Sequence, residues 1–212
     1  MNEARDHILK RLRTVRREAP DTGAPSPATG ADGETLIARF RAALEAVRGE
    51  VHRLRDGDWV GWLARELPAR GVGNLLAGTG EIGHTLQAHP IPGVTLHRYD
   101  RPVEDWKDAL FDHIDAGITG CRGAIAATGS LILWPGPEEP RLLSLVPPLH
   151  IVLLDAANLH ADLATAIRSQ GWAQGLPTNA LLITGPSKTA DIEQTLTWGI
   201  HGPRELVVLI LG

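Results

Sequence analysis

The sequence predicts an α/β fold, in the form of a three-layer sandwich around a mostly parallel β-sheet. The longest apolar runs, such as HIVLLD and ELVVLIL, are continuous rather than alternating in polarity, which is typical of strands covered on both faces. Segments with strand character alternate with segments with helix character along much of the chain. The content of 43% hydrophobic and 22% charged residues is that of a globular domain.

The first 33 residues are expected to lie outside this domain. Residues 2–17 have the pattern of a helix, and its basic stretch from Arg5 to Arg17 is either a solvated face or a contact for an acidic partner. Residues 19–33 are rich in Pro, Gly and Ala, so we expect a flexible linker that cannot bury enough apolar surface to fold. The folded domain is therefore expected to span residues 34–212.

The first half of that domain is expected to alternate helices with short strands. Apolar residues at helical spacing predict a helix over residues 34–48, and a second one that begins near Trp59 and stops at Pro68. A third helix is expected over residues 103–114. The predicted strands are VHRL (51–54), VGNLLAG (72–78) and VTLHRYD (94–100).

The second half begins with GAIAATGSLILWPG (123–136), which predicts two strands separated by a break of small residues. Residues 150–171 are expected to form a strand followed by a helix. Residues 180–196 (ALLITGPSKTADIEQTL) are expected to form a strand, a loop and a helix that begins near Ala190. The last strand is expected at ELVVLIL (205–211).

Composition excludes several classes of function. The net charge of −4 argues against a general nucleic-acid surface, which needs a concentrated basic face. One cysteine, Cys121, cannot form an internal disulfide or a four-cysteine metal or iron–sulfur site, so we expect no metal and no cofactor. No apolar run reaches the roughly 18 residues of a membrane span. The N-terminus MNEARDH lacks the apolar core of a signal peptide, so the cytoplasm is expected.

Ligands of open α/β sheets bind beyond the carboxyl ends of the strands, and three glycine-containing loops could reach that edge. The first, GTGEIGH, places Gly78, Gly80 and Gly83 in a G-x-G-x-x-G pattern after a predicted strand. This is either a dinucleotide fingerprint or a turn in which backbone passes close to another loop. The six residues HTLQAH form only about one and a half helical turns, too few for a full crossover helix, which favours the packed turn.

The second loop contains Thr128, Gly129 and Ser130 between two apolar stretches. Gly129 permits a bend or bulge within a sheet. The two hydroxyl groups are expected to bind either a ligand or a neighbouring carbonyl group.

The third loop, TGPSKTADIE (184–193), carries Thr184, Gly185, Ser187, Lys188 and Thr189. Ser187 or Thr189 could cap the predicted helix, whose first turn would hold acidic residues that offset the helix dipole. A lysine there opposes the dipole unless it faces an anion or pairs with one of those acids. The sequence therefore predicts a small-anion site at a helix N-terminus.

The next turn, GIHGP, contains His201, which is either a packed residue or a member of the same ligand-binding site.

Two stretches carry a family resemblance. TGPSKTADIEQTLTWGIHGPRELVVLIL (184–211), and GITGCRGAIAATGSLILWPG (117–136) with RLLSLVPPLHIVLL (141–154), resemble the lactate-utilisation protein C family of LUD-domain proteins. The resemblance implies an α/β domain related to the sugar-phosphate isomerase and CoA-transferase group. It also implies a role in L-lactate oxidation alongside two iron–sulfur partner proteins. Ala127 departs from the pattern, because many members carry an acidic residue before the Thr-Gly pair; if that acid takes part in chemistry, this chain lacks it.

The leading interpretation is a subunit of a lactate-oxidising complex that binds a small anion at the carboxyl edge of the sheet. One alternative is a stand-alone enzyme acting on a sugar phosphate or an acyl-CoA, by analogy of fold. Another is a dinucleotide-binding oxidoreductase that uses the Gly78–Gly83 loop.

Overall fold

The computed structural model describes residues 5, 7, 10, 11, 32–190 and 196–212. The chain divides into Met1–Gly30 and Ala31–Gly212, and the elements below belong to the second unit. The four described residues of the first unit, which lie in the predicted helix, have helical backbone and are exposed. The rest of that predicted helix, and the predicted linker up to residue 31, lie outside the described residues.

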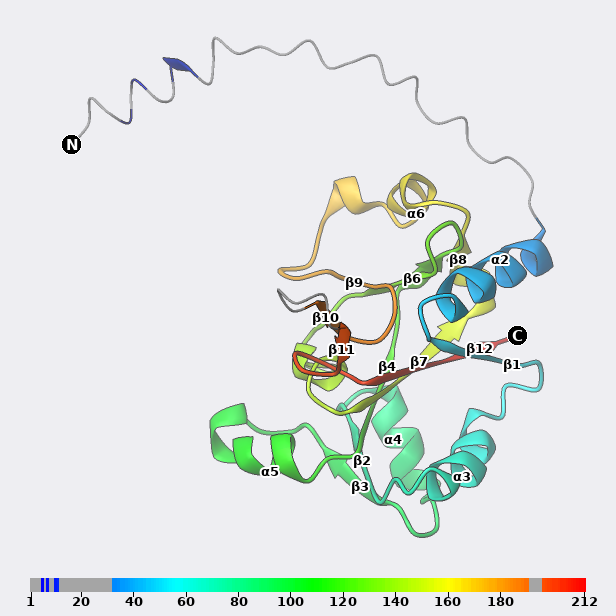
Figure 1. Ribbon diagram of the computed structural model, residues 1–212, viewed down its shortest axis with the longest axis vertical. Coiled ribbons are helices and arrows are strands. Elements are labelled where there is room, and N and C mark those ends of the chain that lie inside the picture. The colour runs from blue at the N-terminus through cyan, green and yellow to red at the C-terminus, as the bar shows by residue number, and fades with distance from the viewer. Residues whose placement is uncertain (1–4, 6, 8–9, 12–31, 191–195) are drawn as a thin grey trace. The chain divides into compact units, whose positions relative to one another are not determined.

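A six-stranded sheet forms the centre of the second unit, in the order β1-β12-β7-β4-β2-β3 (Figure 1). Every neighbouring pair in this sheet is parallel, and β7 and β12 align over their full lengths. The predicted α/β fold with a mostly parallel sheet is therefore confirmed. The strands are β1 (Glu50–Leu54), β2 (Asn74–Ala77), β3 (Thr95–Arg98), β4 (Ala116–Gly120), β7 (Leu149–Asp155) and β12 (Glu205–Leu211).

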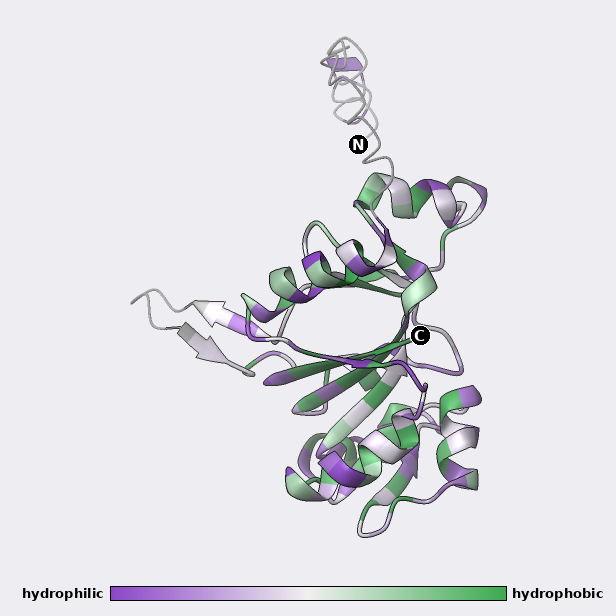
Figure 2. Cartoon of the chain, turned by 90° about the vertical axis from the view of Figure 1, so that its right-hand side faces the viewer, coloured by the Kyte–Doolittle hydropathy of each residue, from purple (hydrophilic) through white to green (hydrophobic). Residues whose placement is uncertain are grey.

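Helices cover one face of this sheet (Figure 2). They are α3 (Trp59–Ala69) and α4 (Glu81–Ala88). The short helix α5 (Lys107–Asp112), preceded by the 3₁₀ turn η1 (Val103–Asp105), lies on the opposite face, where Leu110 packs with Leu76 of β2. Leu63 of α3 and Leu86 of α4 belong to one buried cluster with Ile151 of β7. Leu149 and Leu153 join the same cluster because alternate side chains of a strand point to the same face. Pro68 lies inside the last turn of α3, so this helix continues one residue beyond its predicted end.

The second face is covered by α2 (Gly33–Glu45) and by a smaller sheet in the order β8-β5-β6-β9. Here Phe40 and Leu131 pack with Val152 and Leu154 of β7. The predicted layers on both faces are therefore present, with α2 and α5 on this side, but the small sheet was not expected there. It forms because the small-residue break between the predicted strands is a turn that folds β6 back onto β5. The strands are β5 (Gly123–Ile125), β6 (Ser130–Leu133), β8 (Leu159–His160) and β9 (Leu181–Ile183).

The remaining elements lie around the small sheet and in the connections. Ala166 of α6 (Leu163–Ser169) packs on the outer side of this sheet against Ile125 and Ile132. The 3₁₀ turns are η2 (Arg141–Ser144), η3 (Ala156–Asn158) and η4 (Trp172–Gln174). Among the described residues, no helix is both long enough and apolar enough to cross a membrane.

The helix predicted to begin near Ala190 is wrong. Lys188–Ala190 and Leu196–Trp198 are the strands β10 and β11, which pair in an antiparallel hairpin that projects from the two sheets (Figure 2). Thr189 pairs with Thr197, and β-branched and aromatic residues of this kind favour extended backbone. Residues 191–195, which include Asp191 and Glu193, lie outside the described part of the chain.

Candidate functional site: a cleft between the two sheets

A cleft of about 250 Å³ opens between the two sheets, at the amino ends of β7 and β12. We call it the inter-sheet cleft. It brings together side chains from β7, β9, β12 and the loops between them. Its lining residues are Ser144, Leu145, His150, Leu182, Ile183, Thr184, Gly185, Ser187, His201, Gly202, Pro203 and Leu206.

Backbone hydrogen bonds fix the two loops that supply most of the polar lining. The amide of Ser187 donates to the carbonyl of Pro203 at 2.8 Å, and the amide of Gly199 donates to the carbonyl of Ser187 at 2.9 Å. The amide of Arg204 donates to the carbonyl of Pro148, just before β7, at 2.7 Å. Ser187 and His201 are therefore held on the same side of the cleft although 14 positions separate them in the sequence.

The predicted hydroxyl residues of two separate loops meet beside the cleft. Ser130 Oγ lies 2.7 Å from Thr128 Oγ1 and 2.7 Å from Thr184 Oγ1. Ser130 is buried, whereas Thr184 is exposed and lines the cleft. These hydroxyl groups thus satisfy one another, and only Thr184 of the three is among the lining residues.

Two glycines of these loops permit close contact with α2 and the turn after it. A Cβ at Gly129 would lie 2.7 Å from the Leu44 amide nitrogen, and one at Gly185 would lie 2.9 Å from Val47 Cγ2. Both residues have positive φ, which favours glycine. They shape the site rather than supply polar groups to it. Ala127 lies exposed in the same turn as Thr128 and does not line the cleft.

His150 is the most buried polar residue of the cleft, with no exposed surface. Its Nε2 lies 2.9 Å from Thr119 Oγ1, and its Nδ1 has no hydrogen-bond partner among the described residues. Burial lowers the pKa of His150 to about 3, so the ring is neutral at pH 7. Sequence reasoning missed this residue; the available signal was a histidine at the start of the otherwise apolar strand LHIVLL.

Lys188 and Thr189 do not line the cleft. Lys188 Nζ lies 5.6 Å from the centroid of the Trp198 ring, and the guanidinium carbon of Arg48 lies 4.7 Å from the same centroid. Since Lys188–Ala190 forms a strand, the helix N-terminus on which this anion site was predicted is not present there, and anion binding by Lys188 and Thr189 stays an untested prediction.

The expected position at the carboxyl edge of the sheet is also wrong for this cluster. The loops that begin at Thr128 and Thr184 follow β5 and β9, which belong to the small sheet and pair antiparallel with β6. The rule for parallel strands does not apply to them.

The glycine loop at residues 78–83 does lie at the carboxyl edge. The helix α4 crosses between the parallel strands β2 and β3, so the argument that the segment is too short for a crossover helix is wrong. The loop is nevertheless closed by its neighbours. A Cβ at Gly78 would overlap the Glu138 carbonyl oxygen, and one at Gly83 would overlap the Gly78 carbonyl oxygen. Gly80 caps α4 and lies against the Glu138 carboxylate, which favours the packed turn over a dinucleotide site.

A second pocket of about 260 Å³ lies at this carboxyl edge, where Cys121 and Asp155 are among its lining residues. Cys121 Sγ donates to the Leu153 carbonyl at 3.3 Å, and burial raises the pKa of this thiol to about 12. A thiol with such a pKa is not a nucleophile at neutral pH. In the described part of the chain, no group of three or more His, Cys, Asp or Glu residues is arranged to hold a metal ion.

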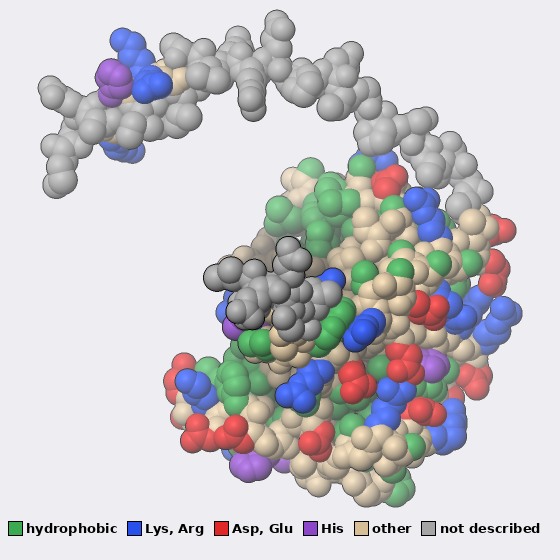
Figure 3. Space-filling model, in the orientation of Figure 1, with side chains coloured by type: hydrophobic (Ala, Val, Ile, Leu, Met, Phe, Trp, Pro, Cys, Tyr) green, Lys and Arg blue, Asp and Glu red, His purple; other side chains and the backbone are tan. Residues whose placement is uncertain are grey.

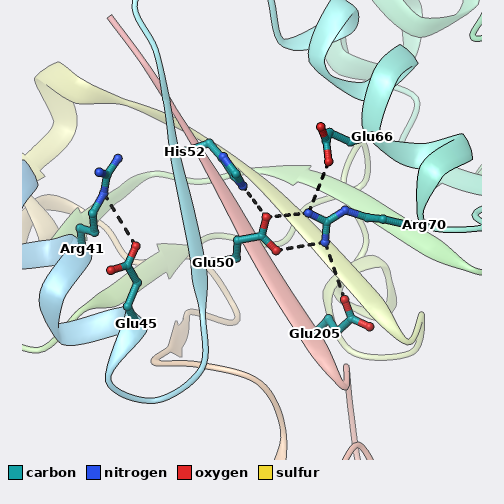
Figure 4. Close-up of polar contacts among 7 residues, drawn as sticks. All are labelled: Arg41, Glu45, Glu50, His52, Glu66, Arg70 and Glu205. Carbon is teal, nitrogen blue, oxygen red and sulfur yellow. Dashed lines mark hydrogen bonds and ion pairs between the residues drawn. The ribbon is translucent and has the colours of Figure 1, made fainter.

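Charged side chains gather instead at the amino ends of β1 and β12 (Figure 4). Arg70, which directly follows α3, makes a two-pronged contact with Glu50, at 2.6 and 3.0 Å, and lies 3.8 Å from both Glu66 and Glu205. His52 bonds the same Glu50 carboxylate. This cluster joins β1, α3 and β12. Over the face drawn in Figure 3, basic and acidic side chains are intermixed rather than separated into a basic surface.

Comparisons with known proteins place the chain in a family. Residues 37–211 match the model of the LUD domain. An uncharacterized protein of Neisseria meningitidis serogroup B is 37% identical over 180 residues, which is 82% of this chain and 76% of that protein. Lactate utilization protein C of Deinococcus radiodurans is 35% identical over 123 residues, 57% of this chain and 56% of its own length. For lactate utilization protein C of Bacillus subtilis the identity is 30% over 126 residues, 58% and 52% of the two chains.

The chain thus spans about half the length of the lactate utilization proteins that it matches. Among solved structures, a DUF162 family protein from Deinococcus radiodurans has the same fold, with a TM-score of 0.59 and 21% identity over 86% of this chain and 100% of that one. From the family model, which covers most of its length, we conclude that the chain belongs to the LUD domain family.

Proposed function

We propose that this chain serves in lactate utilisation and that its inter-sheet cleft binds lactate or a similar small 2-hydroxy acid. The role in lactate utilisation is suggested by the relatives named lactate utilization protein C. The ligand site is suggested by one observation above all, the unpartnered Nδ1 of fully buried His150 in a cleft that also holds three hydroxyl side chains.

The dimensions and chemistry of the cleft suit a small polar molecule. Its volume of about 250 Å³ lies below the range of pockets for drug-sized ligands. No Lys or Arg is among the described residues that line it, so a bound carboxylate is held by hydrogen bonds from hydroxyl groups and backbone amides. Hydrogen bonds to a charged carboxylate contribute about 1.5–3 kcal/mol each, and the lost freedom of the ligand offsets much of this gain. We therefore expect a dissociation constant in roughly the millimolar range.

The oxidation itself is assigned to a complex rather than to this chain alone. With one cysteine, the chain has too few thiolates to ligate an iron–sulfur cluster, so electrons from lactate pass to iron–sulfur partner proteins. The purified chain should therefore bind lactate without oxidising it. Lactate oxidation by the isolated chain, followed with an artificial electron acceptor, would defeat this assignment. The cytoplasmic location stays a prediction.

Calorimetric titration with L-lactate tests the ligand site through two adjacent residues. Ser187→Ala removes a hydroxyl group from the cleft and should weaken L-lactate binding by about 3- to 10-fold. Lys188→Ala is the matched control, because Lys188 lies on Trp198 instead, and it should bind as the wild type does. Equal loss in both variants, or loss in Lys188→Ala alone, would show that the ligand lies elsewhere.

Deletion of the gene in its own organism tests the role in the cell. The deletion strain should grow normally on glucose and poorly on L-lactate as the carbon source, and expression of the chain should restore growth. Normal growth of the deletion strain on L-lactate would contradict the proposed system.

A further inference from the structure

A small polar cavity is lined by Thr119, the hydrogen-bond partner of His150. Thr119 is buried and bonds His150 Nε2. It also lines a cavity of about 10 Å³, close to the volume that one water molecule requires. The lining residues of this cavity are Thr119, Gly120, Leu133, Trp134, Pro135, Glu139, Pro140 and Ser144.

The polar groups around this cavity have unused hydrogen-bonding capacity. Trp134 Nε1 is a buried donor with no partner among the described residues. The Glu139 carboxyl accepts the Gly120 amide, 3.1 and 3.2 Å from its two oxygens, and retains further lone pairs. Ser144 Oγ donates to the Arg141 carbonyl at 2.9 Å and can still accept. A water molecule needs two to four such partners to be stable in a protein interior.

We propose that one water molecule fills this cavity and completes a relay from Glu139 through Thr119 to His150, so that the protonation state of Glu139 decides whether His150 offers the inter-sheet cleft a hydrogen-bond acceptor or a donor. This inference rests on the proposed function for its ligand, but not for the relay itself.

The hydrogen bonds of the relay can run in two directions, and each satisfies the water. With Glu139 ionised, the water accepts from Thr119 and Trp134 and donates to Glu139 and Ser144. Thr119 then accepts the proton of His150 Nε2, which leaves a lone pair on Nδ1. With Glu139 protonated, the carboxyl donates to the water, the water donates to Thr119 and Ser144, and Thr119 donates to His150 Nε2. Nδ1 then carries the proton.

The surroundings of Glu139 allow both states. Burial raises the pKa of this carboxyl, and the neighbouring Glu138 carboxylate raises it further, while the Gly120 amide acts in the opposite sense. The neighbouring Cys121 stays a neutral thiol, and the guanidinium of Arg122 lies over the Trp134 ring, 4.5 Å from its centroid. His150 itself stays neutral because its own pKa is lowered to about 3.

The two states differ in how they discriminate between ligands. A lone pair on Nδ1 accepts the hydroxyl hydrogen of a 2-hydroxy acid such as lactate but finds no donor on the keto oxygen of a 2-keto acid such as pyruvate, whereas an Nδ1 proton can be donated to either oxygen. The lone-pair state thus favours the 2-hydroxy acid, and the protonated Nδ1 removes that preference. No bond of the ligand is made or broken in this step.

Nitrogen-15 NMR of the histidine rings tests the relay without any ligand, since it reports which ring nitrogen carries the proton. In the wild type, His150 should change from the Nδ1–H to the Nε2–H form as the pH rises through the pKa of Glu139, which burial holds above its ordinary value of 4.5. In Glu139→Gln, the amide oxygen accepts from Gly120 and the amide group donates to the water, so His150 should remain Nδ1–H throughout. Glu138→Gln, the matched control, should still titrate. A His150 tautomer that does not depend on pH in the wild type, or that titrates in Glu139→Gln, would overturn the relay.

Calorimetry with L-lactate and pyruvate separates failure of the relay from failure of the proposed function. At a pH above the His150 transition of the wild type, Glu139→Gln should shift the ratio of the two dissociation constants toward pyruvate by about 3- to 10-fold relative to the wild type, the change expected from one hydrogen bond. A tautomer that switches while neither compound binds supports the relay and contradicts the proposed ligand. Binding of both compounds with an unchanged ratio contradicts the relay's effect on selectivity and leaves the ligand standing.

Discussion

His150 is costly to bury, and in the proposed function the same buried ring binds the ligand. Its neighbours Ile151 and Val152 belong to the two opposite hydrophobic clusters and are fully buried, as it is. An imidazole in that position loses its hydration and finds one partner, Thr119. A buried nitrogen without a partner costs about 1–3 kcal/mol, so a ligand that bonds Nδ1 recovers part of this free energy.

The pH dependence of stability should reveal this burial. The folded-state pKa of His150 is about 3 and its ordinary value is 6.5, so below 6.5 the unfolded chain takes up a proton that the folded chain does not. The free energy of unfolding should fall toward acid pH by up to about 1.4 kcal/mol per pH unit from this residue. Denaturant melts at several pH values should show a smaller slope in His150→Gln, whereas His113→Gln, at an exposed position, should keep the wild-type slope. An unchanged slope in His150→Gln would show that the ring is not buried in solution.

Gly129 tests whether α2 packs on the turn between β5 and β6, and Gly57, which has a similar φ, is the control position. The two residues have φ values of 65° and 70°, so alanine is strained by about 1–2 kcal/mol at each. At Gly57 the new Cβ meets no atom within 4 Å, whereas at Gly129 it meets the Leu44 amide at 2.7 Å. Gly129→Ala should therefore lower the free energy of unfolding by about 1–3 kcal/mol more than Gly57→Ala. Equal losses in chemical denaturation would show that α2 does not pack on this turn.

At the scale of elements, the sequence predicted β7 and β12 most clearly, because they are buried on both faces and read as continuous apolar runs. It also predicted β1, β2 and β3 but missed β4, whose short sequence AGITG contains two glycines. Their order could not be predicted, since β1 pairs with β12 from the other end of the domain. The helix expected near Ala190 was wrong because Ser187 and Thr189 were considered only as possible helix caps. The pairing of Thr189 with Thr197 depends on a second strand, which a local cap pattern does not reveal. The site was predictable only in part. Glycines and hydroxyl residues marked its loops, but Thr119 and His150 look like strand residues until two strands are placed side by side.

The ion pairs of Arg70 should stabilise the contacts between β1, α3 and β12. The Arg41–Glu45 contact, also drawn in Figure 4, provides a matched control. The Arg70 hydrogen bonds lower the pKa of Glu50, so this carboxylate stabilises the fold above its ordinary pKa of 4.5, and the stabilisation is lost as the pH falls through its lower folded value. At pH 7, Glu50→Gln should reduce stability by about 0.5–1 kcal/mol, since solvent screens the partly exposed pair. Glu45→Gln, whose contact with Arg41 is exposed and 3.9 Å long, should change it by less. Thermal melts at pH 7 and pH 3 compare the two, and a larger loss in Glu45→Gln would contradict the assignment.

At the scale of the whole molecule, the four hydrophobic clusters form between Leu36 and Leu211. The first lies on one face of the large sheet, and the second and third share the other, with the second over β1, β12 and β7 and the third over β2. The inter-sheet cleft lies where this cover gives way to loops, at the amino ends of β7 and β12.

Removal of residues 1–31 should leave the folding of this unit intact. Asp32, which caps α2 by accepting the Thr35 amide at 2.7 Å, remains in such a variant. The free energy of unfolding should change by less than about 0.5 kcal/mol, whereas Asp32→Ala in the full chain should lower it by about 1 kcal/mol. A loss of cooperative unfolding after the truncation would show that the N-terminal residues are part of the core.

A crystal structure of the protein grown with L-lactate tests the central claim most directly. The account predicts lactate in the inter-sheet cleft, with an oxygen within hydrogen-bond distance of His150 Nδ1 and another near Ser187. Lactate in the carboxyl-edge pocket beside Cys121 and Asp155, with the inter-sheet cleft holding only water, would contradict it.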